Sequence, residues 1–105
     1  MTVLVARVPD ASAADAQVVI VQATDDENPR YDPSRISVTA GSTVTWLNQS
    51  AVPVTVTSAD GLFDSDLIPP GGSFSVVFST PGSFRYFCVP NPSMKGTVNV
   101  AREKN

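Results

Sequence analysis

The chain has 105 residues, of which 42% are hydrophobic and 16% are charged, and its formal net charge is −3. These values predict one domain with a hydrophobic core, and the absence of a basic patch argues against a nucleic-acid partner. The chain has no histidine and a single cysteine, which excludes Ser-His-Asp and Cys-His catalytic groups, intramolecular disulfides and all histidine-containing metal sites. No apolar run reaches the roughly 18 residues of a membrane span. We therefore expect a protein that is not an enzyme and has no membrane span.

The first fourteen residues, MTVLVARVPDASAA, begin with an apolar stretch that Arg7 and Pro9 interrupt. This stretch is shorter than the roughly 7–15 apolar residues at the centre of a signal peptide. We therefore expect no complete signal peptide here. Residues 1–16 are interpreted as an N-terminal extension in which 2–8 can add a strand, and residues 17–105 as the domain itself.

Alternation of apolar and polar residues with a period of two dominates the rest of the chain and predicts short strands. The expected strands are, in chain order, 16–23, two within 36–48 around a turn at 40–42, 52–58, two within 69–88 joined at 81–82, and 96–101. Residues 59–68 lack a regular pattern and are expected to bridge two sheets. Seven or eight short strands with frequent turns predict an all-β protein, an antiparallel β-sandwich.

The same alternation predicts which side chains share a face. In residues 52–58, the three valines Val52, Val54 and Val56 are expected on one face of a strand. Phe84, Tyr86 and Cys88 are expected on one face of a later strand, and the aromatic residues Trp46, Phe74 and Phe78 are expected in the core.

Two acidic groups fall in predicted loops, one at residues 25–27 and one formed by Asp60, Asp64 and Asp66. Neither has the spacing of an EF-hand, and we favour solvated loop charges over calcium binding for both. The sequence PPGGS at 69–73 lacks the lysine ending of a phosphate-binding loop and is interpreted as a hairpin turn.

Four motifs follow one another in a particular order. They are aromatic-x-Pro (31–33), Gly-x-Thr-Val-Thr-Trp-x-Asn (41–48), Pro-Gly-x-Phe-x-Tyr-x-Cys (81–88) and Pro-x-Met-x-Gly-x-Val-x-Val (92–100). In this order the chain, from about residue 17 to 101, resembles the cupredoxins, the small blue-copper electron carriers, and above all amicyanin and plastocyanin. The resemblance implies a Greek-key sandwich of about eight strands with copper at one end, bound by two histidines, a cysteine and a weak axial methionine.

The resemblance can be carried over position by position. Cys88 matches the thiolate ligand, Met94 matches the axial methionine, and Asn48 matches an asparagine beside the site that ties the two ligand loops together. The two histidine positions differ, because Val54 replaces the first histidine in a Pro-His step and Asn91 replaces the histidine of the cysteine loop.

These two replacements argue against a type 1 copper site. Val54 has no donor atom, and the amide oxygen of Asn91 is a hard, weak ligand beside a thiolate. The sequence therefore predicts a copper-free binding or structural module, or a scaffold from which the metal site has been deleted. Two alternatives stay open: copper-dependent electron transfer through an atypical ligand set, and binding of Cu(I) or another soft metal through Cys88 and Met94.

The resemblance also indicates where a partner would bind. In the family, redox partners dock on the apolar loop end around the second histidine. Here Val89, Pro90, Pro92 and Met94 keep that end apolar. We expect a protein partner at this surface, a monomer in the absence of that partner, and, from the resemblance, a periplasmic or extracellular location.

Overall fold

The computed structural model describes residues 15–21 and 29–102. These residues form eight strands and no helix. The strands are β1 (Ala16–Val21), β2 (Arg30–Asp32), β3 (Arg35–Thr39), β4 (Ser42–Asn48), β5 (Thr57–Ser58), β6 (Ser73–Phe78), β7 (Gly82–Cys88) and β8 (Asn91–Ala101). The strand expected at 2–8 and the acidic group at 25–27 lie outside the described residues. The all-β prediction is confirmed.

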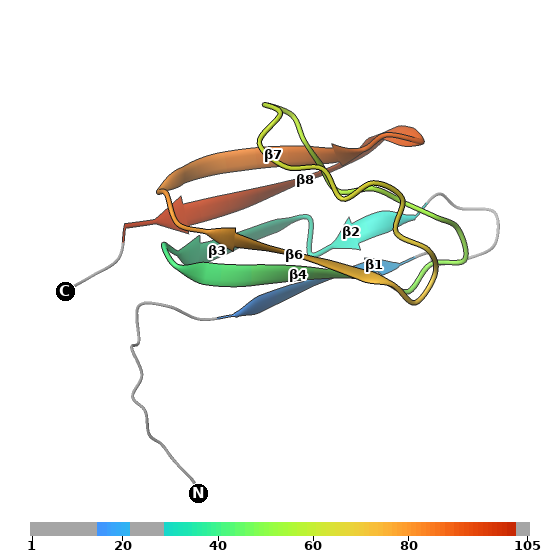
Figure 1. Ribbon diagram of the computed structural model, residues 1–105, viewed down its shortest axis with the longest axis horizontal. Helices are drawn as coiled ribbons and strands as arrows, with labels where there is room; N and C mark the ends of the chain where they lie inside the picture. Colours follow the sequence, from blue (N-terminus) through green and yellow to red (C-terminus); the bar gives the residue numbers. More distant parts are fainter. Residues whose placement is uncertain (1–14, 22–28, 103–105) are drawn as a thin grey trace, which may run out of the picture.

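The strands form two four-stranded sheets, with the orders β2-β1-β4-β6 and β3-β8-β7-β5, which pack face to face (Figure 1). The pairs β1–β4 and β3–β8 are parallel, so the prediction of a purely antiparallel sandwich was wrong in this respect. The reason is that the chain changes sheets between β2 and β3, and parallel neighbours need such a crossover. Within the described part of the chain no helix is long and apolar enough to cross a membrane.

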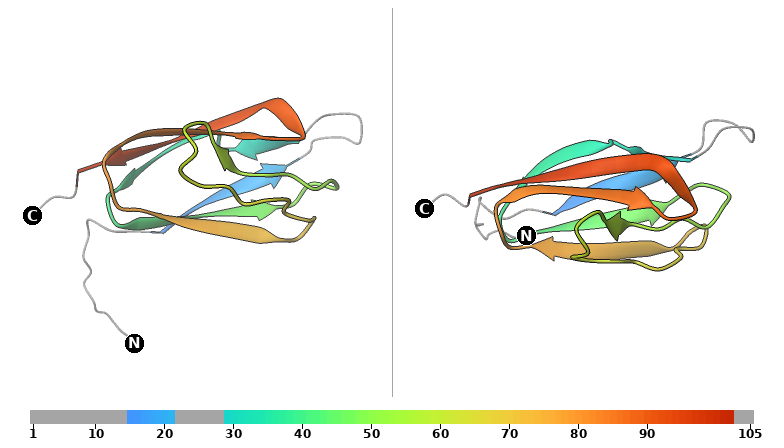
Figure 2. Two further views of the ribbon diagram at one scale, coloured as in Figure 1. Left: turned by 45° about the horizontal axis from the view of Figure 1, so that its top comes forward. Right: turned by 90° about the horizontal axis from the view of Figure 1, so that it is seen from above.

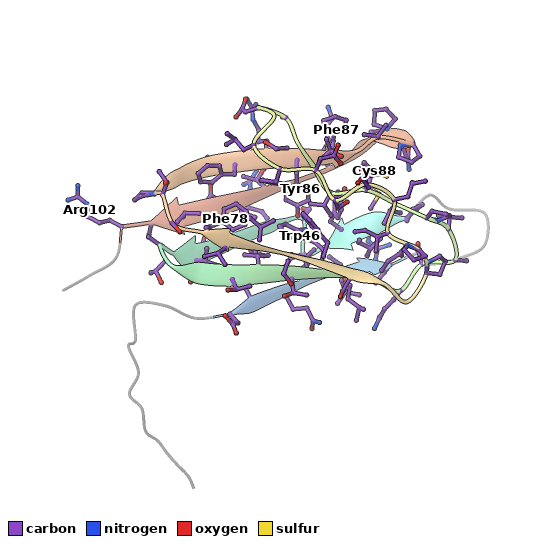
Figure 3. The ribbon with its side chains drawn as sticks, viewed as in Figure 1. Trp46, Phe78, Tyr86, Phe87, Cys88 and Arg102 are labelled. Carbon is purple, nitrogen blue, oxygen red and sulfur yellow. The ribbon has the colours of Figure 1, made fainter. Side chains whose placement is uncertain are left out.

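The core lies between the sheets and is centred on Trp46, whose side chain is fully buried (Figure 3). The expected alternation holds in β4, where every second side chain from Ser42 to Asn48 is buried. The Trp46 ring meets the ring of Tyr86 edge-on at a centroid distance of 5.2 Å and packs against Phe74 and Phe78 at 6.1 and 6.3 Å. Aromatic pairs at these distances stabilise the core beyond the area they bury.

The segment 52–58 differs from the prediction. Only Thr57–Ser58 form a strand, and Val54, Thr55 and Val56 are buried in succession while Val52 is exposed. The cause is a local pairing with the segment expected to be irregular: Val54 and Ile68 exchange backbone hydrogen bonds of 3.1 and 2.7 Å, and the Ser65 amide donates to the Val56 carbonyl. Because other segments of the chain pack on several sides of residues 54–56, consecutive side chains are buried, and burial no longer alternates with a period of two.

The last strand begins five residues earlier than expected, at Asn91 rather than at residue 96. Cys88 and Asn91 are paired across the sheet, and only Val89 and Pro90 separate them. The predicted proline-rich loop is therefore a tight two-residue turn between β7 and β8 at one end of the sandwich (Figures 1 and 3).

Candidate functional site

A bulge in β8 positions the two sulfur-containing side chains of the candidate site. Phe87 pairs with Lys95 and Cys88 pairs with Asn91, so Pro92, Ser93 and Met94 have no separate partners on β7. Such a bulge bends its strand and redirects its side chains. The side chains of Cys88 and Met94 are both buried, with 1% and 5% of their surface exposed.

Thr55 links the segment that contains Val54 to the turn that follows Cys88. The Thr55 amide donates to the Cys88 Sγ at 3.5 Å, and the Thr55 Oγ1 accepts from the Val89 amide at 2.8 Å. Thr55 thus holds the cysteine sulfur from one side and the turn from the other. The sequence reasoning missed this residue, although its place directly after the replaced histidine position was a usable signal.

Tyr31 supports the same segment from the first sheet. Its hydroxyl donates to the Thr55 carbonyl at 2.6 Å, and its ring meets the Tyr86 ring edge-on at 4.6 Å. Burial, and then the neighbouring Cys88 and Tyr86, hold the pKa of Tyr31 well above its ordinary range. The aromatic-x-Pro motif contains Tyr31 but does not predict its contact with the site.

Tyr86 and Gly96 explain the spacing of two sequence motifs. They lie opposite each other on β7 and β8, and a Cβ at Gly96 would lie 2.3 Å from the Cζ and hydroxyl oxygen of Tyr86. The glycine therefore makes room for the tyrosine ring. The Tyr86 hydroxyl lies beside the Trp46 indole N–H, and neither has a hydrogen-bond partner of proper geometry in the described structure. Burial raises the pKa of Tyr86 to about 12.

Asn48 is fully buried, and its hydrogen bonds differ from the role that the resemblance gave it. Its side-chain amide donates to the carbonyls of Val52 and Ile68, both at 2.9 Å, and its Oδ1 accepts from the amide and hydroxyl of Ser50. Asn48 therefore connects the segment that precedes Val54, at Val52, with the segment that pairs with Val54, at Ile68. The link to the Cys88 turn is made by Thr55 instead.

The donor set at this end of the sandwich does not fit a type 1 copper site. Val54, at 1% exposure, brings only hydrocarbon next to the segment that contacts Cys88. Asn91 is half-buried, and its Oδ1 accepts a hydrogen bond of 3.2 Å from the Ser93 hydroxyl. No three residues among the described His, Cys, Asp and Glu gather as a metal site would require. One thiol, one thioether and one amide are a poor match to copper in both oxidation states.

Of the loop acids Asp60, Asp64 and Asp66, Asp64 uses its carboxylate in hydrogen bonds within the loop. The Asp64 Oδ1 accepts from the Asp66 amide at 2.9 Å and from the Thr57 hydroxyl at 3.2 Å. The Asp60 backbone amide donates to the Ser58 hydroxyl at 3.1 Å. The hydrogen bonds of Asp64 shape the turn that brings residues 64–68 against Val54.

The surface around the turn is apolar, although its composition differs from the prediction. Val89 is 53% exposed and Pro90 and Pro92 are exposed, but Met94 is buried and contributes nothing to it. Leu67, at 61% exposure, lines a shallow depression together with Val89 and Pro90. We call the surface formed by Leu67, Val89, Pro90 and Pro92 the apolar end. Asp64 and Asp66 line the same depression and give the apolar end an acidic rim.

Comparisons with known proteins agree with this architecture. The sequence matches the family described as cupredoxin-like domain over residues 1–100. It is 35% identical to plastocyanin of Prochlorothrix hollandica over 95% of this chain and 87% of the relative. The fold resembles a purple cupredoxin from Nitrosopumilus maritimus (TM-score 0.71, 31% identity, 82% of this chain and 99% of the other). It also resembles an amicyanin variant in its Cu(I) form (TM-score 0.69, 28% identity, 89% and 85%). This chain, with its two packed sheets and its Tyr-x-Cys and Met-x-Gly motifs, belongs to the cupredoxin family, whose members typically carry electrons.

Proposed function

We propose that this protein is a cupredoxin without a type 1 copper site, and that it works as a binding module through the apolar end. The observation that carries the proposal is Val54. At the position where the resemblance places the first histidine, a fully buried hydrocarbon side chain packs against the core. A copper ion there would have to replace tightly packed apolar contacts and would gain no donor atom.

Copper binding to the purified protein tests this proposal directly. After addition of one equivalent of Cu(II), we expect no intense visible band from charge transfer between thiolate and copper. Such a band, with a stoichiometry near one, would show that an atypical ligand set exists and would overturn the proposal. It would favour the family's electron-transfer role instead.

A matched variant tests whether only the ligands are missing. The double substitution Val54→His with Asn91→His supplies both imidazoles, while the Thr55 bonds to Cys88 and Val89 depend on backbone and hydroxyl groups that it leaves in place. We expect this variant to bind copper and turn coloured. Val54→His with Asn91→Gln is the control and should stay colourless. A folded double-histidine variant that remains colourless would contradict the proposal that the site is otherwise intact.

The apolar end supports the binding role. Leu67 and Val89 expose most of their side chains beside two prolines that hold the backbone rigid, and a preformed apolar surface binds with little loss of conformational entropy. The acidic rim of Asp64 and Asp66 favours a partner with an apolar face and basic residues around it. We place this encounter in a periplasmic or extracellular compartment, by analogy with the family.

Soft-metal binding is the second candidate, and one observation favours it. The sulfur atoms of Cys88 and Met94 are both in side chains buried at the same end of the core, where water does not compete for a ligand. Titration with Ag(I) under reducing conditions should then show uptake of one equivalent that Cys88→Ser abolishes and Met94→Leu weakens. Absence of stoichiometric uptake would remove this candidate.

A further inference from the structure

We propose that the outer edge of β6 pairs with the same edge of a second copy of the chain, so that two molecules form one continuous sheet. β6 lies at the margin of its sheet, next to β4 only, and no other strand of the described structure pairs with it (Figure 2). The inference concerns a different surface from the apolar end, because Phe78 at the end of β6 lies away from Cys88 along the sandwich (Figure 3).

The backbone of β6 has a set of free hydrogen-bonding groups along this margin. The Asn48 amide donates to the Gly72 carbonyl, and the β4–β6 register continues from this pair. Because bonded pairs alternate in an antiparallel ladder, the backbones of Phe74, Val76 and Phe78 face β4. The N–H and C=O groups of the alternate residues, Ser73, Ser75 and Val77, therefore point away from the sheet. No hydrogen bond to these six groups occurs within the described residues.

β6 also lacks the features that protect other sheet edges. Edge strands usually carry charged residues or proline, or they are very short. β2 has Arg30 and Asp32, β3 begins with Arg35, and β5 has only two residues. The sequence of β6, SFSVVF, has six residues, no charge and no proline. β6 is thus the one long, neutral edge among the described strands.

A second copy fits this edge because the strand is complementary to itself. A two-fold axis through Ser75 pairs Ser75 with its own copy and Ser73 with Val77 in both directions, and these are the residues whose backbone groups point outward. On the inner face the same register sets Phe74 opposite Val76, an aromatic and β-branched pair of the kind that stabilises sheets. Any charged residue near the axis would meet a like charge, and β6 has none.

The side chains around the edge are apolar and incompletely covered. Phe74, Val76, Phe63 and Phe84 are only half-buried although they pack against the core. Val77 and Leu62 are 59% and 64% exposed. Together with Phe63, Phe78 and Phe84 they line a groove with a volume of about 220 Å³. A second sandwich placed edge to edge would cover this groove and its copy at the same time.

Sedimentation equilibrium of the full chain under reducing conditions, from about 10 µM to 1 mM, tests the proposal, since small interfaces such as one pair of edge strands are weak. We expect a reversible monomer–dimer equilibrium. Ser75→Lys and Ser75→Glu should each weaken dimerisation at least about fivefold, because each sets like charges opposite one another on the axis. An equimolar mixture of the two variants should dimerise more tightly than either alone, and this gain should shrink at high salt. Ser37→Lys, at an exposed serine of the edge strand β3, is the matched control and should not change dimerisation.

Several results would overturn the proposal. A wild-type chain that stays monomeric up to about 1 mM would do so. So would a mixture of the charge variants that associates no better than each alone, or dissociation caused by Ser37→Lys. Hydrogen exchange adds a readout that does not depend on the variants: the amides of Ser73, Ser75 and Val77 should gain protection as the concentration rises. If the monomer already protects these amides, another segment of the same chain covers the edge and the proposal is wrong.

Discussion

Val54→Ala is the most direct measure of how completely hydrocarbon fills the position that the resemblance assigns to the first histidine. The Val54 side chain is 1% exposed and belongs to the main core cluster. The substitution removes two carbon atoms, which costs about 1.6 kcal/mol at ~0.8 kcal/mol for each buried carbon. The cavity left behind adds to this cost if its surroundings cannot collapse.

The surroundings of Val54 are held in place by hydrogen bonds that the substitution does not touch. Its backbone pairs with Ile68, and its neighbour Thr55 is bonded to Cys88 and Val89. We therefore expect little collapse and a total loss of about 2–3 kcal/mol in the free energy of unfolding. Unfolding in urea, followed by the fluorescence of the single tryptophan, should show the midpoint lowered by about 1–2 M.

Val89→Ala is the control, because Val89 lies at the same end of the molecule but is 53% exposed. Its free energy of unfolding should change by no more than about 0.5 kcal/mol. A loss below about 1 kcal/mol for Val54→Ala would refute the reasoning. It would mean that the position is loosely packed and that space for a ligand persists there.

Two further predictions concern Tyr86. Gly96→Ala places a Cβ 2.3 Å from the Cζ and hydroxyl oxygen of Tyr86, and the fully buried side chain of Tyr86 cannot move away. We therefore expect the free energy of unfolding to fall by about 3 kcal/mol and the melting temperature to fall by about 10 °C or more. An unchanged melting temperature would contradict the packing described. Burial raises the pKa of Tyr86 from 10 to about 12, so the folded state binds the proton more tightly than the unfolded state does. The contribution of this residue to the free energy of unfolding should be fully present below pH 10. It should be lost as the pH rises from 10 through 12, which lowers the free energy of unfolding by up to about 3 kcal/mol. Denaturant midpoints measured from pH 8 to 12 should show this fall, and Tyr86→Phe should make it shallower.

The fold was predictable from the sequence because its strands follow simple alternation and its motifs occur in the family's order. The aromatic positions Trp46, Phe78 and Tyr86 were placed in the core correctly for this reason. Segment 52–58 was not predictable in the same way. Its burial depends on contacts with residues 64–68, whose irregular sequence gives no period to recognise. Tertiary contacts there override the local pattern.

The candidate site was predictable in its residue types and less so in its connections. Cys88 is where alternation placed it, on the inner face of β7. Met94 was expected at the surface and is buried, because a bulge shifts the register between Phe87 and Cys88, and nothing in the alternation of the sequence predicts that shift. The roles of Thr55 and Tyr31 depend on long-range hydrogen bonds that only the folded chain brings together. Tyr31 and Thr55 are separated by 24 positions in the sequence, and Thr55 and Val89 by 34.

These connections bear on why a cupredoxin can keep its shape without histidine ligands. The position of the Cys88 sulfur is fixed by the Thr55 amide, the turn by the Thr55 hydroxyl, and Thr55 itself by the Tyr31 hydroxyl. The bonds from Tyr31 to Thr55 and from Thr55 to Cys88 are buried, where a satisfied hydrogen bond stabilises and an unsatisfied one is costly, and the bond from Val89 to Thr55 is partly buried. Val54 adds apolar packing at the place where an imidazole would need a metal or another partner. The end of the sandwich is therefore held together by its own contacts, and the exposed side chains of Leu67 and Val89 lie above this bonded backbone.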